Sequence, residues 1–537
     1  MKKIKQVITL LLFTVIILSS FVGVTKAKSE PMTKANTIYY ATFSDPIDLN
    51  PAISSDNASS EVTGFLFRAL LKRDWSGKLI PDMAEAMPTI SNDNKTITFK
   101  LRKGIKWHDG TELTSADIKF SYEFILEPKV ASVRRSNFIN IDTIETPDKY
   151  TVVFKLKEPD SALLPNFSYY YIIPKHIWEP ELQKLLNGTY KSIKESKYNR
   201  EPIGNGPYMF VEWKTAERVV LKRNPNFYDP QPKIEYIVFT ITPSQAVAMV
   251  KTETGEADYV VVPESDVARM RTKSNLNTFV YDRASFDYIV YNLKHPIFSD
   301  KRVRQAIAHA LNKEAMVKGI YKGVASVAHS SYHPKLWAYN PNVKPLQYNL
   351  NRAKQLLDQA GWKVGKDGIR EKNGQKLQFV LMTNKGNIMR EKLVVYIQNQ
   401  LRLVGIKVEP RIIEWNTFLN KYYYAGKYDA VLLGFITSID GDQTVLFHSD
   451  PAKGTFNRNF YKNPQVDKLL DDARKTFDIN EQKKLYWKLQ EIIAEDQPIT
   501  YIAYRKNGLS FNKRVKNVKV VDLLGTNDGY MSWELQK

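Results

Sequence analysis

Few residues in this sequence have the types and spacing that catalysis or metal binding requires. His329 and His333 are four residues apart, which on a helix would align them for a metal ion, but Pro334 and the surrounding Ser and Tyr residues favour a loop. Asp440-Gly441-Asp442 resembles part of a calcium loop, without the remaining acidic ligands. The sequence has no G-x-S-x-G, H-E-x-x-H or phosphate-loop motif and no cysteine. We therefore expect no enzyme activity, no metal site and no cofactor.

The clearest local structure lies at residues 97–121, where a strand, a tight turn and a helix are predicted in succession. Apolar and polar residues alternate from Ile97 to Leu101, as on a strand with one buried face. His108-Asp109-Gly110 has turn chemistry. Thr114, followed by Asp117 three residues later, is typical of a capping box at a helix start.

Strand and helix patterns alternate along the rest of the chain, which predicts layered α/β lobes. The apolar run 65–71 indicates a helix, and residues 518–521 indicate a late strand. Further strands are predicted at 234–242, 258–262, 288–292, 376–382, 406–413, 428–434 and 498–504, with helices at 243–252, 301–311, 353–360 and 393–404.

At 537 residues, the chain is expected to form two or three domains. Its hydrophobic content of 43% and charged content of 25% are those of a folded soluble protein. The formal net charge is +21, but the basic residues are spread along the chain with acidic residues between them. This distribution argues against nucleic-acid binding and favours a basic surface that faces an anionic cell envelope.

Residues 1–27 are typical of an export signal. Three lysines precede an apolar run from Val7 to Leu18, and Thr25 and Ala27 offer a cleavage site. The apolar stretch also approaches the length of a membrane span, so the alternative is an uncleaved N-terminal anchor. In both cases the protein is expected in the cell envelope, at the extracellular face of the membrane.

The string from Thr98 to Ser121, TFKLRKGIKWHDGTELTSADIKFS, resembles the signature of the extracytoplasmic solute-binding proteins of ABC importers, family 5. This family includes oligopeptide-, dipeptide- and nickel-binding proteins, and the chain is most similar to the oligopeptide binders. The resemblance runs from about Thr37 to the C-terminus. Other segments that match the family's patterns are Leu79–Ala84, Pro202–Tyr208, Leu221–Tyr228, Gly255–Asp258 and Arg302–Ile307.

The resemblance implies an α/β fold of the large three-domain periplasmic-binding-protein class (type II), a bilobal clamshell with an inserted domain in lobe I. The chain is expected to cross between the lobes near Tyr288 and near Thr500. The implied segments are lobe I at 28–72, the inserted domain at 73–203, lobe I again at 204–289, lobe II at 290–497 and lobe I at 498–537.

One family feature is missing near the N-terminus. Gram-positive members usually carry a lipobox whose cysteine takes a lipid. Here Leu18-Ser19-Ser20 is followed by Phe21, so we expect no lipid anchor.

The resemblance places the ligand-selecting segment at residues 414–442. Glu414-Trp415 matches the oligopeptide binders, and Gly434-Phe435 stands where they have Gly-Trp. In the family, the residues after this pair form an exposed strand edge, with which a peptide pairs through backbone hydrogen bonds. The implied peptide-binding residues are Trp415, Gly434, Phe435, Ile436, Ser438, Asp440, Asp442, Ser44 and Tyr288.

The family's peptide binders hold the α-ammonium of the peptide with an Asp, and this chain has Ser438 at that position. Burying an ammonium without a carboxylate is costly, so Asp440 or Asp442 takes the role or the ligand has no free amine. We predict Asp440, since Gly441 gives the loop freedom. The alternative is that both are solvated loop acids.

The resemblance implies a monomeric, non-catalytic protein that captures oligopeptides or dipeptides and delivers them to a membrane permease driven by ATPase subunits. The alternatives within the family are a nickel chelate, glutathione or a short oligosaccharide as the ligand. A secreted peptide-sensing protein without a transport role is a further alternative.

Overall fold

The computed structural model describes residues 31–54 and 56–536. The predicted export segment 1–27, which includes Phe21, lies outside the described residues. Among the residues that are described, no helix combines the length and the apolar character needed to cross a membrane.

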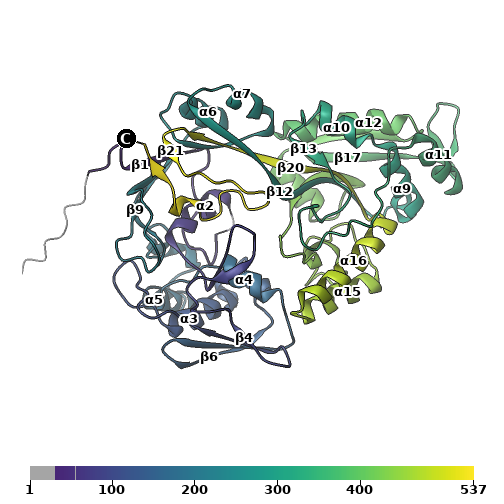
Figure 1. The fold of residues 1–537 in the computed structure, drawn as a ribbon. Helices are drawn as coiled ribbons and strands as arrows, with labels where there is room; N and C mark the ends of the chain where they lie inside the picture. Colours follow the sequence, from purple (N-terminus) through teal and green to yellow (C-terminus); the bar gives the residue numbers. More distant parts are fainter. Residues whose placement is uncertain (1–30, 55, 537) are drawn as a thin grey trace, which may run out of the picture.

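In the described chain, one sheet of eleven strands runs through both lobes (Figure 1). Its order places late strands between early ones, so neither lobe is a continuous stretch of sequence. The order is β18 (Lys407–Ile413), β17 (Gln378–Asn384), β19 (Ala430–Ile436), β12 (Leu276–Tyr291), β20 (Ile499–Asn512), β11 (Tyr259–Val262), β1 (Thr37–Thr42), β10 (Tyr236–Ile241), β9 (Arg218–Arg223) and β8 (Tyr208–Lys214), with β13 (Ala325–Val327) paired to β20.

The two long strands β12 and β20 connect the lobes. They pair antiparallel, and the register shifts between Asp282 and Phe286 and again between Asp287 and Tyr288. Phe511 of β20 packs in a core cluster with β1 and β10, whereas Tyr288 packs in a cluster of the second lobe. The irregular centre of this strand pair thus lies where the chain passes from one core to the other, beside one of the two predicted crossing points.

The second lobe buries both faces of its part of the sheet. Along β19, Ala430 and Leu432 belong to one core cluster, and Val431 and Leu433 to the other, as the alternation of a strand requires. Helices cover each face (Figure 1). One face carries α9 (Lys301–Ala310), α10 (Lys313–Gly319), α11 (Leu350–Gln359) and α12 (Ile388–Arg402), and the other carries α15 (Pro464–Lys475) and α16 (Ile479–Asp496).

A third unit, the inserted domain, has its own core among residues 52–193. Ile97 and Phe99 are fully buried in it, as the strand pattern predicted. A carboxylate oxygen of Asp117 accepts a hydrogen bond from the backbone N of Thr114 at 2.8 Å, so the predicted helix start is confirmed. The unit contains β4 (Thr89–Ile90), β5 (Thr96–Lys100), β6 (Ile141–Asp148), β7 (Thr151–Leu156), α3 (Ser115–Leu126), α4 (Leu163–Tyr169) and α5 (Lys175–Leu186).

Shorter elements complete the described fold. The helices are α2 (Asn57–Leu66), α6 (Gln245–Glu253), α7 (Val267–Arg271), α8 (Pro296–Ser299), α13 (Trp415–Thr417) and α14 (Thr444–Phe447). The small sheets pair β2 (Leu71–Arg73) with β3 (Leu79–Pro81), β21 (Val515–Lys516) with β22 (Glu534–Leu535), and β15 (Arg370–Lys372) with β14 (Lys363–Val364) and β16 (Gln375–Lys376).

Two predicted elements are wrong. The helix predicted at 65–71 ends at Leu66, because distant partners take the backbone groups that would continue it. Gly206 donates to the carbonyl of Leu66 at 2.8 Å, and the side chain of Asn205 accepts from the backbone N of Arg68 at 2.8 Å. Residues 518–521 do not form a strand; Val518 and Val520 pack on the first lobe's core without a neighbouring strand to pair with.

Candidate functional site

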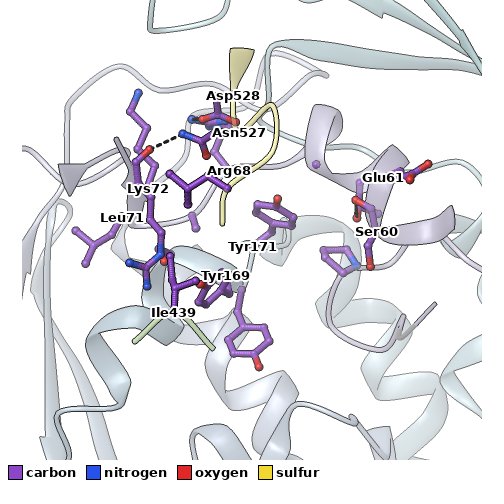
Figure 2. Close-up of a pocket in the computed structure, with 18 of the residues that line it drawn as sticks. Ser60, Glu61, Arg68, Leu71, Lys72, Tyr169, Tyr171, Ile439, Asn527 and Asp528 are labelled. Atoms are coloured by element: carbon purple, nitrogen blue, oxygen red, sulfur yellow. Dashed lines mark hydrogen bonds and ion pairs between the residues drawn. The ribbon is translucent and has the colours of Figure 1, made fainter. Parts of the chain in front are cut away.

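Two adjoining cavities lie between the inserted domain, the first lobe and the second lobe. The first cavity has a volume of about 980 Å³ and the second about 690 Å³. The last residue of β19 and the four residues after it, 436–440, line both cavities. Figure 2 shows the first cavity, with Arg68 and Asp528 on one side and Ser60 and Glu61 of α2 on the other.

The end of β19 presents one free backbone edge to these cavities. Ile436 lies opposite Ser285 of β12, and Thr437 donates to the carbonyl of Ala284 at 2.8 Å. In this antiparallel register, the N–H and C=O of Ile436 point away from β12. On that other side, β17 pairs with β19 only at Ala430 and Val431 within the described residues. Ile436 is 56% exposed, so its backbone edge is open to a ligand strand.

Asp440 is held by a cation from across the cleft. Its carboxylate forms an ion pair with Arg73, which belongs to β2 and stacks over the ring of Tyr169 at 5.2 Å. The Ser438 hydroxyl donates to the same carboxylate at 2.6 Å. The side chains of Arg73 and Asp440 are only 9% and 16% exposed. The carboxylate that the sequence suggested as an ammonium anchor is therefore already neutralised by the protein.

Asp442 is also engaged. Its side chain accepts from the backbone N of Thr444 at 2.8 Å at the start of α14, and it lines the second cavity. Arg474 of α15 lines the same cavity and is paired with Asp160 of the inserted domain through two hydrogen bonds of 3.0 and 2.9 Å. The pairs Arg73–Asp440 and Asp160–Arg474 thus join the inserted-domain side of the cleft to the second lobe at two places.

The other predicted site residues fall into two groups. Phe435 lines the second cavity beside Ile436. Gly434 lies against Arg390, and a Cβ at this position would come within 2.4 Å of that guanidinium, so the close packing requires a glycine. Gly434 and three further residues line neither cavity: Tyr288 is buried in the second lobe's core, Ser44 is exposed after β1, and Trp415 stacks on Phe418 at 6.1 Å.

The signature histidine has a structural role. The Nδ1 of His108 accepts from the backbone N of Gly204 at 3.1 Å, and its Nε2 lies 3.1 Å from the carbonyl of Gly206. This pattern requires the neutral Nε2–H tautomer. Burial lowers the pKa of His108 to about 4. The signature loop thus holds the 204–206 turn, which in turn ends α2.

Within the described residues, no group of three or more His, Asp or Glu side chains could hold a metal ion. His329 and His333 lie in a loop, as their surroundings predicted.

Sequence reasoning missed most of the cavity wall. Arg73, Asp160 and Arg474 come from separate parts of the chain, and no local pattern marks them. The run of three tyrosines at 169–171 is a local signal that could have marked part of the wall, since all three line the first cavity.

Comparisons with known proteins agree with this architecture. Residues 78–456 match the model of the family described as bacterial extracellular solute-binding proteins, family 5, middle region. The chain is 32% identical over 500 residues to the oligopeptide-binding protein AppA of Bacillus subtilis. The alignment covers 92% of this chain and 90% of AppA.

Solved structures match along nearly the whole chain. AppA in complex with a nonapeptide has a TM-score of 0.78 at 30% identity and covers 93% of this chain and 99% of its own. NikZ of Campylobacter jejuni with Ni(L-His) has a TM-score of 0.79 at 29% identity, and the match covers 94% of this chain and 100% of the NikZ chain. DppA of Helicobacter pylori with the peptide STSA has a TM-score of 0.77 at 26% identity, and the match covers 93% of this chain and 98% of the DppA chain. The expected family and the α/β clamshell fold are confirmed.

Proposed function

This chain belongs to the bacterial extracellular solute-binding proteins of family 5, which are binding proteins and not enzymes, and on this premise we propose that it captures extracellular oligopeptides for an ABC importer. The observation that carries the proposal is the free backbone edge of Ile436 inside the cleft. A peptide can add to such an edge as a further strand, and main-chain hydrogen bonds then bind it whatever its sequence.

The size of the cleft supports a ligand longer than a dipeptide. Pockets for drug-sized molecules have volumes of about 300–1,000 Å³. The first cavity alone, at about 980 Å³, reaches the top of this range, and the second adds about 690 Å³ beside it. AppA, which was solved with a nonapeptide, supports the same ligand class.

The two cavities suit different parts of a peptide. Charged side chains line the first cavity, including Arg68 and Asp82. The wall of the second cavity also contains charged residues, but more of its exposed surface is apolar, and Leu164, Val445 and Tyr486 belong to this wall together with Ile436. We assign the second cavity to side chains of the bound peptide, and Ile436, Ser438 and Phe435 to the contacts along its backbone.

Delivery to the importer requires opening and closing of the lobes. Hinge closure around the ligand is the usual motion of periplasmic binding proteins. We place the hinge at the irregular centre of β12 and β20, near Asp282–Tyr288, because register shifts interrupt the ladder there. The pairs Arg73–Asp440 and Asp160–Arg474 stabilise the closed form, which is the form expected to dock on the permease.

The test is the identity of the ligand. Mature protein, purified from its own cells, is denatured, and the released small molecules are identified by mass spectrometry. The proposal predicts a mixture of peptides of several lengths and sequences. Because NikZ with a nickel–histidine complex is about as similar as AppA, a nickel chelate is the second candidate. Release of nickel with a chelator, and of no peptide, would favour that candidate and contradict the proposal.

A further inference from the structure

One carboxylate in the first cavity has no counter-ion in the described structure. Asp82 and Asp528 pair with Arg68, each at 2.8 Å, and Asp440 pairs with Arg73. Glu61 also lines this cavity, yet no ion pair or hydrogen bond to its side chain exists among residues 31–54 and 56–536. Among the described acidic residues that line this cavity, Glu61 thus differs from the others, each of which forms an ion pair with an arginine.

The helix α2 fixes the position of Glu61. Asp56 caps its N-terminus by accepting from the backbone N of Ser59 at 2.8 Å. Val62 and Phe65 anchor one face of the helix in the first lobe's core, while Glu61 stays exposed to the cavity. Figure 2 shows Glu61 and Ser60 on this helix at the edge of the cavity.

Tyrosines from neighbouring strands line the same cavity as Glu61. Tyr40 of β1 and Tyr259 of β11 line the same cavity, with ring centroids 4.5 Å apart. The Glu61 carboxylate influences the titration of both, and of Tyr281 on β12. Aromatic faces beside a carboxylate favour a cation electrostatically, because the ring quadrupole is negative at its face.

The electrostatic state of Glu61 agrees with a role in binding a cation. Burial raises its pKa to about 7, and no positive group of the described protein offsets this effect. Arg283, which lines the cavity, does not pair with it. Glu61 is open to the cavity, so water can solvate its carboxylate, and a ligand ammonium that pairs with it would favour its ionised form.

We propose that Glu61, flanked by Tyr40 and Tyr259, forms the subsite for an ammonium group of the bound ligand. The proposal rests on the function proposed above and replaces Asp440 and Asp442 in the role suggested by the sequence, since Arg73 and the start of α14 engage those two carboxylates. The ammonium has two possible sources, the α-amine of a peptide and the side chain of a lysine residue.

The experiment is calorimetric titration of the wild-type protein and of Glu61→Gln with matched peptides. One pair is a lysine-free peptide with a free or an acetylated N-terminus, which tests the α-amine. The other pair is an acetylated peptide with lysine or norleucine at one position, which tests the side chain. Glu85→Gln is the matched control, because Glu85 is an exposed glutamate outside both cavities.

A hydrogen-bonded charged group typically contributes about 1.5–3 kcal/mol, so Glu61→Gln should weaken binding of one ammonium-bearing peptide by roughly 10- to 100-fold. Binding of the matched peptide without that ammonium group should weaken by less than about 3-fold. If the lysine side chain is the source, the acetylated lysine peptide should also bind wild type more tightly as the pH rises from 6 to 8, because Glu61 ionises. If the α-amine is the source, Glu61→Gln should weaken binding of the lysine-free peptide with a free N-terminus and not of its acetylated form. Circular dichroism melting checks that Glu61→Gln is folded, and Glu61→Asp provides a second, charge-retaining variant.

The outcomes separate the two proposals. If wild type binds free and uncharged peptides and Glu61→Gln affects both members of each pair equally or not at all, the ammonium subsite is refuted while the peptide function stands. If wild type binds none of the peptides, the proposed function fails, and the subsite fails with it.

Discussion

The substitution Asp440→Asn distinguishes the sequence-based prediction from the structure. As the ammonium anchor, Asp440 would matter only for peptides with a free amine. As the partner of Arg73, it would matter for every ligand, because the pair joins the two sides of the cleft. In the substituted protein, the guanidinium of Arg73 would remain mostly buried, with a backbone carbonyl at Gly77 and the ring of Tyr169 as its remaining partners.

The magnitude follows from the burial of the pair. Breaking a fully buried ion pair costs about 3–5 kcal/mol. Since this pair borders a cavity that water can enter, we reduce the figure to about 2 kcal/mol, which corresponds to a roughly 30-fold loss of affinity. On the proposed hinge motion the contact forms when the lobes close around any peptide, so the loss should be the same for free-amine and N-acetylated peptides.

The assay is calorimetric titration with both peptides, with Asp472→Asn as the control because Asp472 pairs with Lys468 on an exposed helix surface. Arg73→Gln should give a similar loss, and the double variant should lose less than the sum of the two, as expected for residues in contact. A loss confined to the free-amine peptide would refute this reasoning and restore Asp440 as the ammonium anchor.

Three further results are expected. Asp160→Asn removes the bidentate bond to Arg474, so small-angle scattering of the ligand-free protein should show a larger radius of gyration; an unchanged radius would mean that this pair does not hold the lobes. Burial lowers the pKa of His108 from 6.5 to about 4, so the unfolded state binds the proton first. The contribution of His108 to the free energy of unfolding is complete above pH 6.5 and should fall by up to about 3 kcal/mol towards pH 4. Urea unfolding of His108→Gln should therefore show a smaller loss of stability between pH 6.5 and pH 4 than the wild-type protein. Trp415→Ala should change peptide affinity less than about 2-fold, because Trp415 lies outside both cavities and contributes no contact energy to the ligand there; a 10-fold loss by calorimetry would place it in the site.

Local physics accounts for the parts of the fold that the sequence predicted correctly. The strand at Thr96–Lys100 and the helix that begins after Thr114 depend on alternation and on a cap within a few residues. The helix predicted at 65–71 fails for the opposite reason, since the groups that end it belong to Asn205 and Gly206, far away in the sequence.

The site was predictable only where it follows one strand. The family resemblance implied Phe435, Ile436 and Ser438, and the structure places all three in a cavity wall because β19 and its continuation form one continuous segment. The partner of Asp440 was not predictable, because Arg73 is 367 residues away and has no distinctive neighbours. Glu61 escaped notice for a similar reason, since a single glutamate on an amphipathic helix is normally a solvated residue.

The central claim is that a peptide pairs with the backbone edge of Ile436, and an N-methyl scan of a bound peptide tests it most directly. N-methylation removes one backbone donor at a time and leaves the side chains unchanged. We expect weaker binding, by roughly 3- to 10-fold, at those alternate positions whose N–H faces Ile436 or Ser438, and little change when side chains are exchanged. Uniform affinity across the scan, together with strong dependence on side chains, would contradict the claim.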